Sequence, residues 1–141
     1  MSAMRKIIYS LLGVLVANGA VLAYFIVMNK EWETKFSGVL DIFPFYLAFS
    51  LLGWIFVGIP FVLVISSEVI IELNWLIVVL IGLFLGALAQ SLIFLRFGIT
   101  GHLNFPVHWG GVLAYEKLAM VVSAVAFVVY CALARRTLRQ Q

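Results

Sequence analysis

The sequence predicts an all-α integral membrane protein, a four-transmembrane-helix bundle of two helical hairpins with the N and C termini on the same side. First, 65% of the 141 residues are hydrophobic and only 11% are charged, whereas soluble domains are about half apolar and about a quarter charged. Second, four apolar runs reach or approach the roughly 20 helical residues that a bilayer core requires. We therefore expect residues 1–141 to form a single membrane domain, with the lipid bilayer as its first partner.

The first predicted span covers residues 7–28 and carries Asn18 near its middle, without any charged side chain. A signal peptide is the alternative interpretation, because Arg5 and Lys6 precede the apolar run. The apolar region of a signal peptide is about 7 to 15 residues long, and this run is longer. We therefore expect a retained helix, in which Asn18 forms a hydrogen bond to a neighbouring helix or, alternatively, contacts a substrate.

The second predicted span covers residues 43–65, and Pro44 suits its first turn. Pro60 lies inside the span, where it removes one backbone hydrogen bond and crowds the carbonyl of Phe56. We expect a helix kink at this point. Because the freed carbonyl needs a partner in lipid, we also expect this face to pack against protein.

The third predicted span covers residues 75–95 and follows an acidic link that ends at Asn74, a residue suited to capping a helix. Gly82, Gly86 and Gln90 recur every four residues and therefore share one helix face. This face allows a second helix to approach closely, and Gln90 can form a hydrogen bond across the contact or meet a substrate. We expect the face to pack within the chain, and a homodimer contact is the alternative.

The fourth predicted span covers residues 112–134, but Glu116 and Lys117 interrupt its first third. Either the helix starts at Lys117, or it starts earlier and carries both charges toward the membrane. Ionisable residues inside a membrane are functional candidates, because each costs about 2.5 kcal/mol or more at a helix centre. The simpler interpretation places the ammonium of Lys117 among the headgroups and Glu116 at the wet end of the helix. The alternative makes Glu116 a proton or cation site.

Basic residues flank the outer ends of the first and last predicted spans, at Arg5, Lys6, Arg135, Arg136 and Arg139. Flanking positive charge favours the cytoplasmic side, so we expect both termini in the cytoplasm. The basic residues form no cluster interleaved with aromatic side chains, which argues against a nucleic-acid partner. The single cysteine, Cys131, excludes an internal disulfide and a thiolate metal cage.

The two loops expected on the opposite side share a pattern of a basic residue, Phe, a small residue and then Phe-Pro. The pattern occurs as Lys35-Phe36-Ser37 before Phe43-Pro44 and as Arg96-Phe97-Gly98 before Phe105-Pro106. A parallel duplication of two helical hairpins would leave such an echo. Chance is the alternative, because the two spacings differ and the helices that follow do not align without gaps.

Histidines occur only at His102 and His108, both in the second of these loops. Zinc usually takes three or four ligands, and haem held between helices takes ligands from facing spans. We therefore expect no metal and no cofactor, and keep the two histidines as candidate binding residues. The sequence has no nucleophile elbow, metalloprotease motif or phosphate-binding glycine loop, so we do not expect an enzyme.

These observations favour a non-enzymatic binding or accessory protein that recognises another membrane protein or a toxin. In size and layout the chain resembles the small four-span immunity proteins that protect bacteria from pore-forming toxins, and this implies the bacterial cytoplasmic (inner) membrane. One alternative is a subunit of a small-solute or ion transporter or channel, which requires a homo-oligomer. The other is a membrane-embedded lipid-modifying enzyme, whose polar residues would be Arg96, His102, His108, Glu116 and Lys117.

Overall fold

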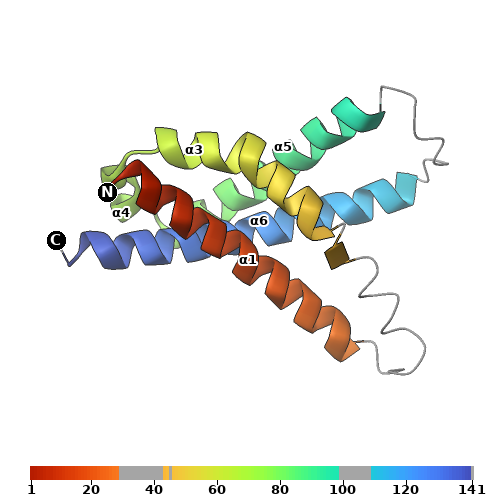
Figure 1. The fold of residues 1–141 in the computed structure, drawn as a ribbon, viewed down its shortest axis with the longest axis horizontal. Helices are drawn as coiled ribbons and strands as arrows, with labels where there is room; N and C mark the ends of the chain where they lie inside the picture. Colours follow the sequence, from red (N-terminus) through yellow and green to blue (C-terminus); the bar gives the residue numbers. More distant parts are fainter. Residues whose placement is uncertain (29–42, 45, 99–108, 141) are drawn as a thin grey trace.

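All the regular secondary structure in the described residues is helical. The computed structural model describes residues 1–28, 43, 44, 46–98 and 109–140, with side chains described except at 28, 93–98 and 109–116. The elements are α1 (Ala3–Met28), the π-helical segment η1 (Trp54–Gly58), α3 (Ile59–Val64), α4 (Ser67–Glu72), α5 (Trp75–Gly98) and α6 (Trp109–Leu138). Figure 1 shows their course.

Four helical segments are long and apolar enough to cross a membrane, which confirms the predicted number of spans. They are Ala3–Val27, Tyr46–Val64, Trp75–Leu92 and Lys117–Leu138. The second of these, called the second span below, consists of helical residues 46–53 followed by η1 and α3. In the fourth, α6 begins at Trp109, so the helix continues through Glu116 and Lys117 instead of starting at Lys117.

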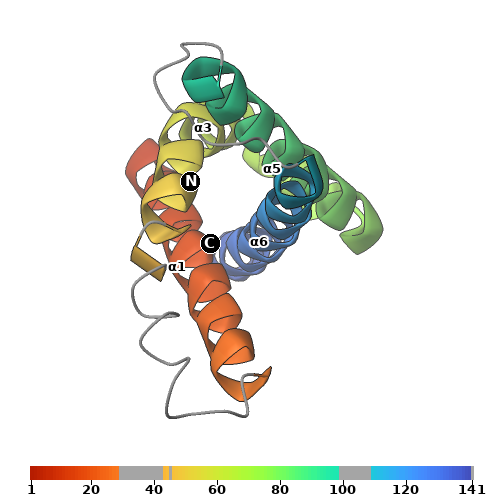
Figure 2. The same ribbon diagram turned by 90° about the vertical axis from the view of Figure 1, so that its right-hand side faces the viewer.

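Among the described elements, helix α6 packs along both α5 and α1 and also contacts α4. The second span contacts α1 through both η1 and α3, and it contacts α5 through η1. In the end-on view of Figure 2, the order around the molecule is therefore α1, the second span, α5 and α6.

Glycines allow the close approach of α6 to its two neighbours. A Cβ atom added at Gly82 would lie 2.5 Å from the Cα of Ala124, and one at Gly86 would lie 2.5 Å from the carbonyl oxygen of Ala119. A Cβ at Gly13 of α1 would likewise meet the carbonyl oxygen of Ala126. Small residues thus bring backbones together where no hydrophobic effect drives helices to associate.

The second span contains a π-helical turn that ends at Gly58, two residues before Pro60. The Ile59 N–H bonds to the carbonyl of Trp54, five residues earlier, and regular helix resumes in α3 with Pro60 in its first turn. We expected the Pro60 face to pack against protein, but Pro60 and Phe56 are both exposed. In membrane helices, a local π adjustment is one way to pair backbone groups near a proline without a neighbouring helix.

The link between the second span and α5 is a short capped helix. Ser66 caps α4, accepting a hydrogen bond from the Val69 N–H at 3.3 Å. Asn74 caps α5, accepting from the Leu76 N–H at 3.1 Å, which confirms the predicted cap.

Both chain ends lie at the same end of the molecule as α4 (Figure 1). The hydroxyls of Tyr9 on α1 and Thr137 on α6 are hydrogen-bonded at 2.8 Å and tie the two helices together there. We call this end of the molecule the terminal end.

Two buried apolar clusters fill the space between the helices. The cluster nearer the terminal end consists of Val62, Ile70, Val78, Phe127, Tyr130, Cys131 and Ala134. The second consists of Val14, Ala17, Val122 and Ala126. Each cluster includes α6 residues, so this helix forms one wall of both.

Candidate functional site

Polar side chains line one face of α1 and are buried there. Lys6, Ser10 and Asn18 are 8%, 6% and 2% exposed. Their spacing of four and eight residues places them on the same side of the helix. We call these three residues the polar face of α1, and it is the main concentration of buried polar groups in the described residues.

Asn18 links α1 to the second span in the interior. Its side-chain amide nitrogen donates to the carbonyl of Val14 at 2.9 Å, and its amide oxygen accepts from the hydroxyl of Ser50 at 3.1 Å. A buried amide left unpaired would be costly, so these bonds fix both the rotamer of Asn18 and the approach of the second span.

Ser10 makes a second link two turns nearer the terminal end. The indole N–H of Trp54 donates to the Ser10 hydroxyl at 3.0 Å, and that hydroxyl donates to the Ile7 carbonyl at 2.8 Å. Trp54 is the first residue of η1. The polar face of α1 therefore holds the π-helical turn of its neighbour by a direct bond.

Lys6 makes the third link, at the C-terminal end of α3. Its ammonium donates to the carbonyl of Ile65, the residue that caps α3. The last carbonyls of a helix lack intrahelical donors and carry partial negative charge, so a cation stabilises them.

Arg135 of α6 likewise binds backbone carbonyls at the C-terminal end of α4. Its Nε donates to the carbonyl of Ile70 at 2.8 Å, and its terminal nitrogen donates to the carbonyl of Leu73. The guanidinium carbon also lies 4.3 Å from the ring centroid of Trp75, a cation–π contact. Arg135 thus caps the C-terminal end of α4 and also contacts the first residue of α5.

Unlike the buried polar groups described above, the hydroxyl of Tyr130 has no hydrogen-bond partner among the described residues. Tyr130 is 1% exposed, and it stacks on Phe127 with ring centroids 5.8 Å apart. Buried hydroxyls are normally paired, so this group carries an uncompensated desolvation cost.

The other candidates from the sequence are dispersed or lie outside the described residues. Gln90 is half-buried on α5, and Lys117 is exposed on α6. Among the described residues, Asn18 forms its side-chain bonds with Val14 and Ser50, and none with Gln90. The side chain of Glu116 lies outside the described residues, as do His102 and His108 altogether. The proton-site and lipid-enzyme interpretations therefore stay predictions.

Ser10, Ser50 and Trp54 were not among the candidate site residues predicted from the sequence, and Lys6 and Arg135 were predicted only as flanking charge. For the α1 residues a signal was present, because Lys6, Ser10 and Asn18 share one helical face. For Arg135 no local pattern shows that its guanidinium reaches carbonyls more than sixty residues away in the chain.

The described part of this arrangement is suited to holding helices together. Every hydrogen-bonding group of the polar face is bonded to a carbonyl, a hydroxyl or an indole of the same chain. Among the residues that the structure describes, no group of three or more His, Cys, Asp or Glu could hold a metal ion. No protein family, curated protein or solved structure significantly matches the chain.

Proposed function

We propose that the chain is a non-enzymatic binding or accessory protein, a four-helix bundle of the bacterial cytoplasmic (inner) membrane with both termini in the cytoplasm. Its partner would be another membrane protein or a membrane-directed toxin. The observation that carries the proposal is the polar face of α1. Its buried polar groups form hydrogen bonds with the second span and with the residue that caps it. Because these groups already have partners, they favour a rigid scaffold over an open polar site.

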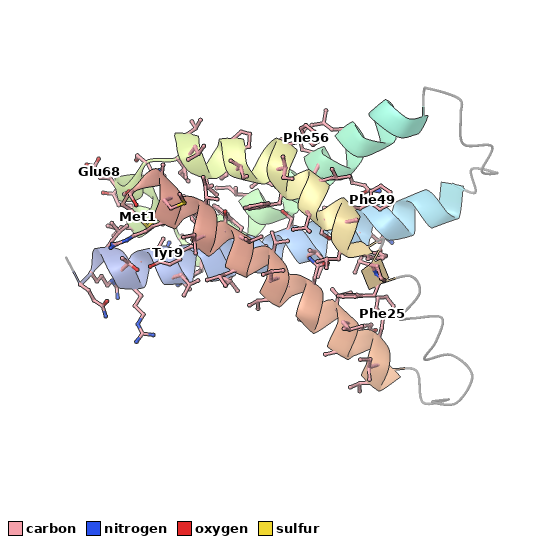
Figure 3. All side chains as sticks on the ribbon, in the orientation of Figure 1. Met1, Tyr9, Phe25, Phe49, Phe56 and Glu68 are labelled. Atoms are coloured by element: carbon pink, nitrogen blue, oxygen red, sulfur yellow. The ribbon has the colours of Figure 1, made fainter. Side chains whose placement is uncertain are left out.

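The outer surface supports the same proposal, because large aromatic side chains point away from the interior on several helices. Phe25 on α1, Phe49 and Phe56 on the second span and Phe84 on α5 are all exposed. Figure 3 shows Phe56 on the outer side of the second span. Aromatic side chains are enriched in protein interfaces, and lipid covers those that a partner does not.

Photo-crosslinking from these positions tests the proposal. Benzoylphenylalanine replaces Phe25, Phe49, Phe56 or Phe84 in turn, and Phe127, which is buried, serves as the control. We expect a discrete protein adduct from one face of the molecule in native membranes, identified by mass spectrometry and lost when the partner gene is deleted. Only lipid adducts from all four positions would contradict a protein partner.

A transporter or channel subunit is the second candidate. It is favoured by η1, because π-helical turns recur at functional sites and this one borders the polar face of α1. Flux of protons, sodium or potassium into liposomes containing the purified chain would support it. Liposomes that show no flux of these ions at any protein density would exclude a transporter or channel function for them.

The orientation is tested separately by chemical labelling. Gln140 is exposed beyond the end of α6, and Cys131 is fully buried. A Gln140→Cys, Cys131→Ala variant should react with a membrane-impermeant maleimide in inside-out vesicles and not in intact spheroplasts. The reverse result would place the termini outside.

A further inference from the structure

The basic residues at the terminal end divide into two groups with different roles. The charged side chains of Lys6 and Arg135 donate hydrogen bonds to backbone carbonyls at the ends of α3 and α4. The remaining three, Arg5, Arg136 and Arg139, are exposed, and their guanidinium groups form no ion pair or hydrogen bond with a described residue. These three charges are therefore available to something outside the chain.

The three free arginines lie at the same end of the molecule, on neighbouring helix turns. Arg5 lies one turn before Tyr9, and Arg136 and Arg139 flank Thr137. Because the hydroxyls of Tyr9 and Thr137 are hydrogen-bonded at 2.8 Å, the helix turns that carry these arginines are held next to each other. We call Arg5, Arg136 and Arg139 the arginine surface.

Acidic side chains do not neutralise this surface. The exposed carboxylates of the terminal end, Glu68 and Glu72, both belong to α4. Figure 3 shows Glu68 on the outer side of α4, away from the end of α6. Among the described residues, neither carboxylate forms an ion pair with one of the three arginines.

The depth of the arginine surface matches the headgroup region of a bilayer. Arg5 lies near the start of the apolar segment Ala3–Val27, and Arg136 and Arg139 lie at or just beyond the end of Lys117–Leu138. Guanidinium groups bind phosphate oxygens in a bidentate geometry. Anionic lipids attract juxtamembrane Lys and Arg by about 1 kcal/mol per residue, which corresponds to about fivefold in affinity.

We infer that the arginine surface binds the headgroup phosphate of an anionic phospholipid, in preference to zwitterionic lipid. The three arginines form no hydrogen bond or ion pair with a described residue, so lipid binding does not compete with contacts inside the protein. It is independent of the proposed protein partner, because it concerns the terminal end and not the aromatic outer surface.

Native mass spectrometry of the full chain in a neutral detergent tests this inference. Phosphatidylglycerol and phosphatidylcholine with the same acyl chains are titrated in parallel, and inorganic phosphate is added as a competitor. We expect preferential retention of phosphatidylglycerol that weakens with salt and that equimolar inorganic phosphate does not abolish. Equal retention of the two lipids, or displacement by equimolar phosphate, would overturn the inference.

Variants locate the site. Arg5→Gln, Arg136→Gln and Arg139→Gln should each weaken phosphatidylglycerol binding about fivefold, and the triple variant about 100-fold. Lys117→Gln removes an exposed cation at the other end of the apolar part of α6 and should leave binding unchanged. The triple Arg→Lys variant keeps the charge and should retain most of the preference. Unchanged binding in the single Gln variants would exclude this surface, even if the triple variant did not fold.

Discussion

The indole Nε1 of Trp54 lies 3.0 Å from the hydroxyl oxygen of Ser10, so the first residue of the π-helical turn is bonded to the buried face of α1. Ser10 in turn donates to the carbonyl of Ile7, one turn back along α1. This relationship joins the least regular point of the second span to a regular helix, and it gives the indole ring a fixed direction.

The Ser10–Trp54 bond should contribute measurably to stability. Ser10→Ala and Trp54→Phe each remove one partner, and interhelical bonds of this type contribute about 0.6 kcal/mol on average. The free energy of unfolding, measured by SDS titration in mixed micelles, should show a coupling of this size in a double-mutant cycle. Strictly additive losses would mean that the two side chains act independently.

Gly86→Ala should separate α5 from α6. The added Cβ would lie 2.5 Å from the carbonyl oxygen of Ala119 and 2.6 Å from the Cα of Met120, and both are backbone atoms. Overpacking of this kind costs about 1 to 3 kcal/mol, which the same SDS titration would detect.

Gly19→Ala is the matched control for this helix contact. Nothing lies within 4 Å of an added Cβ at Gly19, although that residue is also inside a spanning helix. It should unfold at the same or slightly higher SDS fraction, because alanine has the better helix propensity. Equal losses from both substitutions would show that the close contact with α6 is not the cause of the loss at Gly86.

Arg135→Gln should loosen α4 from the rest of the molecule. The substitution removes bonds to the carbonyls of Ile70 and Leu73 and the contact with the Trp75 ring. Hydrogen bonds to charged groups contribute about 1.5 to 3 kcal/mol. Hydrogen exchange of the amides in residues 66–74 should accelerate accordingly.

The neighbouring Arg136 provides the comparison. Its guanidinium is exposed and bonds to no described residue, so Arg136→Gln should leave exchange in residues 66–74 unchanged. It removes only a favourable charge in the last turn of α6, worth less than about 1 kcal/mol. Faster exchange in both variants would attribute the effect to net charge instead of to the Arg135 bonds.

Tyr130→Phe should preserve or raise stability. The hydroxyl is buried with no partner among the described residues, and leaving such a group unsatisfied costs about 1 to 3 kcal/mol. The ring and its stacking on Phe127 are retained in the variant. The SDS unfolding midpoint is the measurement. A clear loss of stability would show that the hydroxyl has a partner beyond the described side chains, such as a buried water.

The number of spans and the cap at Asn74 could be predicted because they depend on local properties. A membrane helix must satisfy its own backbone and exceed the thickness of the apolar core, and both conditions are visible in a hydropathy run. The cap depends on a side chain two residues from the N–H that it binds. Candidate residues of the site were identified less completely, since only Asn18 of the polar face was singled out.

Pro60 shows where a local rule was insufficient. The missing N–H predicted a kink and a face packed against protein. The kink stays a prediction, whereas the face expectation was wrong, because Pro60 is exposed and follows a π-helical turn. More than one local arrangement can satisfy the freed carbonyls, and the contacts of Trp54 with Ser10 accompany the one adopted.

The sequence by itself determined that the chain has four segments apolar enough to cross a bilayer, roughly where they lie, and that Gly82 and Gly86 share one helix face. Only the tertiary structure decided which faces meet: Gly82 and Gly86 against α6, Asn18 with Ser50, and Lys6 and Arg135 with helix ends instead of lipid. The physical reason is that span and periodicity are set by the solvent and by the backbone of each helix alone. A choice of partner depends on how whole helices rotate and cross, which is settled by the packing and hydrogen bonds of residues far apart in the chain.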